Sequence, residues 1–269
     1  MSEHFFAPCP RGLEALLVED IEAAGAADVR QVPGGAQFSG SWETCYRVNL
    51  ESRIASRVLW RVAGGAYKSE DDVFRLALAV DWPALFAVER SLRVYVTAVK
   101  SPLKSLEFIT LRVKDAVCDR FRDTCGIRPN VNTARPDIRP HLFLTADTAT
   151  LYLDTSGEPL WARGHKIAKV EAPVKENLAA GILRLIGWQP GTPLYDPMCG
   201  SGTFLIEAAQ MSLGDALKRN FAGWQCWFFS GDPALPKLIR LQARRRIPLY
   251  NGALDCRLYL FPMVAGGNR

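Results

Sequence analysis

The chain has 269 residues, of which 48% are hydrophobic and 23% are charged, a composition typical of folded globular proteins and not of disordered segments. Its formal net charge of +5 favours a polyanionic partner without requiring one. The longest apolar runs, 76–80 and 224–229, are far shorter than the roughly 20 residues that cross a bilayer, and the first residues lack the pattern of a secretion signal. We therefore expect a cytoplasmic protein.

Cysteines are spread along the whole chain, at positions 9, 45, 118, 125, 199, 226 and 256. Their number is odd, and no two of them form a Cys-x-x-Cys pair. This usage fits reduced thiols better than disulfides or a zinc site, so we expect no structural metal.

The N-terminal part alternates helical and strand-like patterns. Apolar residues recur at the spacing of one helix face over residues 12–24, and Gly25 can end that helix. A strand is expected at 36–39, followed by a second helix from about 42 to 60.

The next part combines a strand, a long helix and a hairpin. Residues 92–99 alternate, with Val94, Val96 and Ala98 on one face and Tyr95, Thr97 and Val99 on the other, which predicts a strand. Helical spacing over 106–124 predicts a helix whose opposite face carries basic residues, and such a face meets either solvent or phosphate. Segments 141–145 and 150–154 predict a hairpin, so this half of the chain is expected to be α+β.

The remaining part begins with a polar connector and then follows an α/β pattern. The expected elements are a helix at 175–186, a strand at 194–196, helices at 203–211 and 213–220, a strand at 224–230 and a hairpin around 251–252 that ends at 258–261. The strand at 194–196 leads through a glycine-rich turn into a helix, which is how an α/β nucleotide-binding unit begins.

The turn reads Asp196-Pro197-Met198-Cys199-Gly200-Ser201-Gly202-Thr203, and its two glycines let the backbone approach a ligand without a side-chain clash. A dinucleotide fingerprint would need a third glycine where Leu205 stands, and a phosphate-cradling loop would need a lysine where Thr203 stands. An acid at the end of a strand suits a ligand that carries an amino group and a sulfonium beside adenosine. Asp196 is therefore expected to face the methionine part of S-adenosylmethionine, although an ordinary glycine-rich connection is the alternative.

A longer run, Asp-Pro-Met-Cys-Gly-Ser-Gly-Thr-Phe-Leu-Ile-Glu-Ala-Ala at 196–209, carries a more specific signal. It resembles motif I of the THUMP-containing ribosomal RNA guanine-N2 methyltransferases. Other segments similar to that family lie upstream and in family order, at 114–117, 119–121, 126–129, 153–160, 163–164 and 172–180.

The resemblance implies an order of domains and an activity. Residues 1–65 would form a ferredoxin-like domain, 66–155 a THUMP domain that binds RNA, and 163–269 a class I methyltransferase domain with an α/β Rossmann-like fold. The implied activity is methyl transfer from S-adenosylmethionine to the exocyclic N2 of a guanine in 23S ribosomal RNA of the large subunit.

The same resemblance implies which residues bind. The cofactor would contact the turn at Asp196, Pro197, Cys199, Gly200, Gly202 and Thr203, and Glu176 and Asn177 would lie near it. RNA would contact Lys114, Arg120, Arg128 and Arg135. Capping of a helix start is the alternative role for Glu176 and Asn177, and a solvated helix face is the alternative for Lys114 and Arg120.

A base-holding motif is missing from the chain. A guanine amine is a poor nucleophile because its lone pair is delocalised, so members of the family hold the amine and the extruded base with an Asn-Pro-Pro-Tyr motif. Neither Asn-Pro-Pro nor Asp-Pro-Pro occurs here, and the nearest segment, 231–236, lacks the second adjacent proline and the aromatic residue. An acid for the ribose hydroxyls is expected about 20 residues after the turn, near Phe221, where none stands. The catalytic residues therefore stay unknown.

The spacing of the later segments indicates an internal deletion. Residues 213–218 and 223–227 resemble family elements that normally follow the catalytic motif, and 163–269 has room for only about half of the strand-helix-strand units of such a sheet. We therefore predict an incomplete methyltransferase domain, shortened near 210–213, with exposed strand edges and weak or absent catalysis.

Three functions remain open at this point. The first is an RNA methyltransferase, and the second is an RNA-binding module that carries a non-catalytic methyltransferase remnant. The third is a cofactor-binding α/β protein without a nucleic acid partner, which salt-independent or absent RNA binding would favour.

Overall fold

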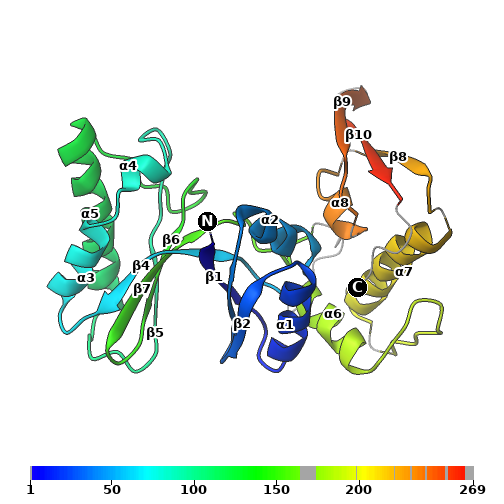
Figure 1. The fold of residues 1–269 in the computed structure, drawn as a ribbon, viewed down its shortest axis with the longest axis horizontal. Coiled ribbons are helices and arrows are strands. Elements are labelled where there is room, and N and C mark those ends of the chain that lie inside the picture. The colour runs from blue at the N-terminus through cyan, green and yellow to red at the C-terminus, as the bar shows by residue number, and fades with distance from the viewer. Residues whose placement is uncertain are drawn as a thin grey trace. The chain divides into compact units, whose positions relative to one another are not determined.

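A computed structural model describes residues 2–163, 174–197, 199–220, 222–230, 232–239, 241–251 and 254–263. The chain forms two compact units (Figure 1). Unit 1 runs up to Phe6 and then from Arg57 to Gly157. Unit 2 consists of Ala7–Ser56 and Glu158–Arg269, so unit 1 is inserted into the sequence of unit 2. No helix among the described residues has the length and apolar character needed to span a membrane.

Unit 1 is built on a sheet with helices on one side (Figure 1). Its elements are the start of β1(Glu3–Pro8), β4(Leu59–Ala66), α3(Glu70–Leu78), α4(Trp82–Leu85), β5(Tyr95–Ala98), α5(Leu106–Cys125), β6(Pro140–Leu144) and β7(Thr148–Asp154). The strand order in this unit is β1-β4-β7-β6-β5. Only β5 and β6 run parallel, and the other neighbours are antiparallel. The hairpin expected at 141–154 is confirmed.

The core of unit 1 lies between the sheet and the three helices. It contains Val73 from α3, Trp82 from α4, Val113 from α5 and Leu151 from β7, all at most 1% exposed. The helix expected at 106–124 is confirmed, because α5 buries one face on this core and ends at Gly126, whose φ of 73° is a left-handed cap.

The N-terminal part of unit 2 contains two helices and a hairpin: α1(Glu14–Ala23), β2(Ala27–Val32), β3(Gly35–Gly40) and α2(Trp42–Glu51). The expectation of a helix continuing to residue 60 was wrong, because α2 ends at Glu51. Ser52 is extended, with a ψ of 129°, and both its hydroxyl and the backbone N–H of Arg53 donate to the carboxylate of Asp20. These hydrogen bonds turn the chain away from the helix axis.

The C-terminal part of unit 2 contains α6(Glu176–Leu185), α7(Thr203–Asn220), β8(Gln225–Ser230), α8(Leu235–Leu238), β9(Arg245–Asn251) and β10(Leu254–Pro262). The strands form an antiparallel sheet in the order β8-β10-β9. The strand expected at 224–230 and the two arms of the closing hairpin are confirmed, while the turn residue Gly252 lies outside the described residues.

Two expectations in this part were wrong. Residues 194–196 form no strand, since no strand in the described part of the chain pairs with them and an unpaired strand leaves its N–H and C=O groups without partners. The two helices expected at 203–211 and 213–220 are one continuous helix, α7. Ser212 does not interrupt α7, because its hydroxyl donates to the carbonyl of Ala208 at 2.9 Å within the same helix.

Candidate functional site

The glycine turn before α7 is a tight bend. Gly200 has a φ of 51° and Gly202 a φ of 73°, left-handed values that cost other residues about 1–2 kcal/mol each. The backbone N–H of Gly202 donates to the carbonyl of Cys199 at 2.7 Å, and that of Ile206 donates to the carbonyl of Gly202 at 2.9 Å. The second hydrogen bond begins the helix, so both glycines are needed where loop becomes helix.

The turn presents an accessible surface. Pro197, Cys199 and Gly200 are exposed, and Asp196 is half-buried. Thr203 is 3% exposed, and its hydroxyl donates to the carbonyl of Val174 at 3.4 Å, which ties the start of α7 to the residues just before α6. The first N–H groups of any helix lack partners within the helix, so the start of α7 can hold polar groups of a ligand.

Glu176 and Asn177 open α6 and are buried, at 5% and 0% exposure. The carboxylate of Glu176 accepts a hydrogen bond from the backbone N–H of Arg163 at 2.8 Å. The side-chain amide of Asn177 donates to the carbonyl of Ile54 at 3.1 Å and to the hydroxyl of Ser56 at 3.0 Å. Its Oδ1 is also buried, and among the described residues it accepts no hydrogen bond. Both side chains therefore anchor α6, and the buried Oδ1 of Asn177 can still accept a hydrogen bond.

A buried charge cluster lies one helical turn beyond the glycine turn. Glu207 of α7 is 0% exposed, and its Oε2 lies 2.8 Å from Nη1 of Arg53 and 2.9 Å from Nη1 of Arg163. Arg163 also donates to the carbonyl of Arg53 at 3.2 Å, and Arg53 donates to Oε1 of Gln210 at 3.1 Å. The cluster holds α7 to two segments that lie far apart in the sequence.

Lys237 in α8 adds a further cation near this cluster. Burial, together with the positive charge of Arg163, lowers the pKa of its ammonium to about 8. Lys237 therefore stays mostly protonated at neutral pH but loses its charge at a lower pH than an exposed lysine does.

A cavity of about 400 Å³ lies beside the start of α6 and is lined by Cys9, Pro10, Ser56, Val174, Lys175 and Leu178. Burial raises the pKa of the Cys9 thiol to about 12, and the negative charge of Glu14 raises it too. Cys9 therefore stays protonated and is no nucleophile at neutral pH. No group of His, Cys, Asp or Glu among the described residues is arranged to hold a metal ion.

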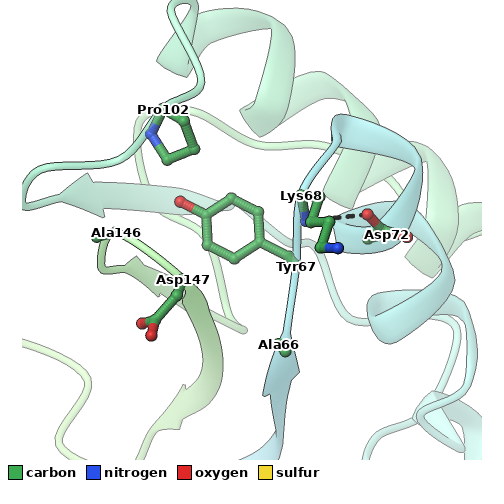
Figure 2. A pocket seen from close by; sticks show the side chains of 7 residues that line it. All are labelled: Ala66, Tyr67, Lys68, Asp72, Pro102, Ala146 and Asp147. Atoms are coloured by element: carbon green, nitrogen blue, oxygen red, sulfur yellow. Dashed lines mark hydrogen bonds between the residues drawn. The ribbon is translucent and has the colours of Figure 1, made fainter.

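A second cavity, of about 470 Å³, lies in unit 1 between the end of β4 and the β6–β7 turn (Figure 2). The Tyr67 hydroxyl donates to the carbonyl of Thr145 at 2.7 Å, and Asp72 accepts the backbone N–H of Lys68 at 3.0 Å. That N–H bond is the largest cause of the lowered pKa of Asp72, followed by the bond from Arg75. The polar groups of this cavity thus form hydrogen bonds that hold the start of α3 and the adjacent β6–β7 turn in place.

The four residues expected to contact RNA differ in their surroundings. Lys114 lies 2.8 Å from the carboxylate of Asp115, and Arg120 lies 3.4 Å from that of Asp81. Arg128 and Arg135 are exposed in the loop after α5, and within the described residues their guanidinium groups form no ion pair. The loop arginines are therefore more available to phosphate than the helix residues.

The segment nearest to a base-holding motif has a structural role. The carboxylate of Asp232 accepts the backbone N–H of Ala234 at 2.8 Å, and its own N–H donates to the hydroxyl of Ser230 at 3.0 Å. These bonds shape the turn between β8 and α8. Phe221, near which the spacing places a ribose-binding acid, lies outside the described residues, as do Met198 and the connector 164–173.

The sequence interpretation missed the charge cluster and a stack of side chains in unit 1. Glu207 lies four residues after Thr203, so both are on one helix face, and a lone acid on an apolar face was an available signal. The stack consists of Arg93, Tyr95 and His141, and Tyr95 meets His141 only through the register of β5 and β6.

Three family models match the chain in succession. The RlmL ferredoxin-like domain matches residues 4–59, the THUMP domain 67–154 and the RMKL-like methyltransferase domain 163–214. A curated relative, ribosomal RNA large subunit methyltransferase K/L of Syntrophotalea carbinolica, is 44% identical over 229 residues. That alignment covers 82% of this chain but only 32% of the relative, so the chain spans about a third of the length of this relative.

Solved structures share the fold. A protein of Listeria monocytogenes, described as a predicted N6-adenine-specific DNA methylase, is 30% identical with a TM-score of 0.70, over 79% of this chain and 56% of that one. SMU.472, described as a methyltransferase and solved with SAH, is 21% identical with a TM-score of 0.67, over 97% of this chain and 98% of its own. The observed architecture is thus ferredoxin-like and THUMP domains followed by a methyltransferase-like α/β part.

Proposed function

On the premise that this chain belongs to the THUMP-containing large-subunit ribosomal RNA methyltransferase family, we propose that it binds S-adenosylmethionine at the turn 196–203 and serves methyl transfer to N2 of a guanine in 23S ribosomal RNA. The observation that carries the cofactor part is the pair of left-handed glycines, Gly200 and Gly202, immediately before α7. Ribosomal RNA is proposed as the partner because the THUMP match covers most of unit 1.

The residues around the turn fit the chemistry of this cofactor. When bound, S-adenosylmethionine supplies a methyl group on a positively charged sulfur and an ammonium on its methionine part. The half-buried carboxylate of Asp196 suits the ammonium, and the buried Oδ1 of Asn177 is a further acceptor in this part of unit 2. The glycines allow the backbone to approach the ligand, and Pro197, Cys199 and Thr203 shape the same surface. Glu176 acts by holding Arg163 and α6 in place.

We also propose the domain limits 1–65, 66–155 and 163–269, with the last domain shortened near 210–213. The matched ranges support these limits, because the methyltransferase match stops at residue 214, beside the proposed junction. For RNA contacts, the exposed Arg128 and Arg135 have more support than Lys114 and Arg120, which lie beside carboxylates.

The cofactor proposal is tested by calorimetric titration of the full chain with S-adenosylmethionine and its demethylated product. We expect Gly202→Ala to abolish the heat of binding, because a methyl group at a φ of 73° distorts the turn. Gly126→Ala is the matched control, since Gly126 has the same φ of 73° and an open environment in unit 1. Absence of any heat with the folded wild-type chain would refute cofactor binding.

A second function, RNA binding without catalysis, has its own support. The chain has no Asn-Pro-Pro motif, and the carboxylate of Asp232 is bonded within its own turn. Transfer of labelled methyl groups to undermodified large-subunit RNA decides between the two functions. Incorporation supports the enzyme, and RNA binding without incorporation supports the non-catalytic module.

A further inference from the structure

The face of the unit 1 sheet that lies opposite its helices carries a row of aromatic and basic side chains. Strand register aligns Arg61 with Tyr152, Tyr152 with His141, and His141 with Tyr95, across β4, β7, β6 and β5. Side chains alternate along a strand, so these four point away from the core that includes Leu142 and Leu151. Tyr152 is only 6% exposed, so solvent reaches this row mainly at Arg61 and at the β5 end. The three helices of unit 1 all contribute to that core, which leaves this row without a helix of its own unit.

Planar groups at the β5 end of the row are stacked. The rings of Tyr95 and His141 are 4.8 Å apart with an interplanar angle of 13°, and the guanidinium carbon of Arg93 lies 5.0 Å from the centre of the Tyr95 ring. Arg93 is exposed, Tyr95 is half-buried, and the His141 side chain is 21% exposed. Arg93 also donates to the carbonyl of Thr133, which holds its guanidinium in place. The ladder Arg93–Tyr95–His141 therefore ends in a planar, positively charged group that solvent can reach.

The charge around this ladder is positive. Asp154 is almost fully buried beside it and pairs with Arg57, so its negative charge is already compensated. Burial, followed by the positive charges of Arg57 and Arg139, lowers the pKa of His141 to about 4. Nε2 of His141 lies 3.9 Å from the carboxylate of Asp154, so both arginines and this paired carboxylate face the ring. His141 is thus a neutral ring at physiological pH, suited to stacking and surrounded by arginines.

The basic face of α5 is different, because carboxylates lie along it. Arg112 is 2.6 Å from Asp71, and Arg122 is 2.8 Å from Asp119. Lys114 and Arg120 also have acidic neighbours, as described above. Phosphates would have to displace these carboxylates, whereas Arg61 makes no ion pair within the described residues. The charge pattern favours the sheet over the helix.

We propose that the helix-free sheet face of unit 1, centred on the ladder Arg93–Tyr95–His141 and flanked by Arg61 and Arg139, binds single-stranded RNA. This inference rests on the proposed function and names the surface that receives its substrate. Guanidinium and aromatic planes stack on unpaired bases of any sequence, and the flanking arginines contact the phosphates. A paired helix would not expose base faces to such a ladder.

The test uses the full chain and fluorescence anisotropy with a fluorescein-labelled, single-stranded RNA of about 12 nucleotides of mixed sequence. We expect Tyr95→Ala and Arg93→Ala each to weaken binding about fivefold or more, because each interrupts the stack. Tyr95→Phe keeps the ring and is expected to bind like the wild type. Arg61→Ala should lower the slope of log affinity against log salt by about one, as expected for a lost phosphate contact.

The matched control is Arg122→Ala, which removes one positive charge from α5 where Asp119 already neutralises it. It should change affinity less than twofold. If Tyr95→Ala lowers the melting temperature, Arg93→Glu replaces it as the test variant, because Arg93 is exposed and its substitution should weaken RNA binding without disturbing the core. The proposal is overturned if Lys114→Ala or Arg120→Ala weakens binding more than the ladder variants do, or if the folded wild type does not bind this RNA. Loss of cofactor binding alone, measured by titration, would refute the methyltransferase role and leave the RNA surface standing.

Discussion

At the scale of single residues, the ion cluster around Glu207 combines three charges that are almost fully buried. One carboxylate that is 0% exposed faces two guanidinium groups whose side chains are only 3% and 2% exposed. Moving such charges out of water costs several kcal/mol for each ion, so the cluster stabilises the fold only while all three members are present. Glu207 is therefore a positioning residue, because it holds the helix that begins at the glycine turn.

The first prediction concerns Glu207→Gln. The amide keeps the shape of the side chain but leaves Arg53 and Arg163 without a counter-charge, and we expect a loss of about 3–5 kcal/mol in the free energy of unfolding. Urea denaturation measures this loss. Glu51→Gln is the control, because Glu51 pairs with Arg47 at a site where both side chains are more than a third exposed, and it should cost less than about 1 kcal/mol. Equal effects of the two substitutions would contradict the role of the cluster.

The second prediction concerns the pH dependence that His141 produces. Its pKa is about 4 in the folded state against 6.5 for a free side chain, with burial as the main cause, so the unfolded chain binds the extra proton between these values. The free energy of unfolding should therefore fall as pH falls from about 6.5 to about 4. Burial raises the pKa of Asp154 above its usual 3.8, so the folded chain binds a proton there more readily than the unfolded chain does. Just above pH 3.8, protonation of Asp154 therefore raises the free energy of unfolding as pH falls and offsets part of the loss caused by His141.

His141→Phe tests this, since phenylalanine can stack on Tyr95 but cannot be protonated. The urea midpoint of the wild type should fall relative to that of the variant as pH falls from 7 to 5, because only the wild type loses stability through His141 there. Parallel curves for both proteins over this range would show that His141 does not titrate as inferred.

At the scale of elements, the position of α6 depends on a close approach to the residue that precedes α1. Gly181 lies in α6, and a methyl group built on it would come within 2.4 Å of Leu13 Cδ1 and 3.1 Å of Leu13 Cγ. Leu13 itself is 2% exposed and has little space to move. Arg184, one turn further along α6, reinforces the contact through Asp20 at 2.6 Å.

The third prediction is that Gly181→Ala destabilises the protein, even though alanine favours helix by about 1 kcal/mol over glycine. Overpacking costs about 1–3 kcal/mol, so the clash with Leu13 should outweigh the gain in helix propensity. The double variant Leu13→Ala/Gly181→Ala should lose less than the sum of the two single variants, because the shorter side chain makes room for the methyl group. Strict additivity in the urea denaturation would mean that the two residues do not press on each other.

Local patterns allowed the sequence to predict some elements and not others. The helix at 106–124 and the hairpin at 141–154 were predicted because periodicity, caps and turn residues lie within each segment. The strand at 194–196 was wrong, since a strand depends on a distant partner that no periodicity reveals. The glycine turn was predicted from the spacing of its residues. The hydrogen bond from Thr203 to Val174 and the pairing of Tyr95 with His141 could not be predicted, because each joins residues that are far apart in the sequence.

At the scale of the whole molecule, the main segment of unit 1 lies in sequence between two segments of unit 2, and each unit has buried residues of its own. The core of unit 1 contains Leu151, which is 0% exposed. A cluster of its own in unit 2 contains Ile239, Tyr259 and Phe261 beside the β8-β10-β9 sheet. Cores without shared residues can lose stability separately, even when they belong to one polypeptide.

The fourth prediction follows from this division. Leu151→Ala should cost about 2–5 kcal/mol, because it leaves a cavity in a packed core, and the loss should fall on unit 1. Hydrogen exchange read by mass spectrometry should then show faster exchange in peptides from 57–157 and unchanged exchange in β8 and β10. Ile239→Ala is the reciprocal variant and should reverse the pattern, because Ile239 packs with Tyr259 and Phe261. If either substitution accelerates exchange in both units equally, the chain unfolds as one cooperative body, and RNA binding by unit 1 could not persist after unit 2 is destabilised.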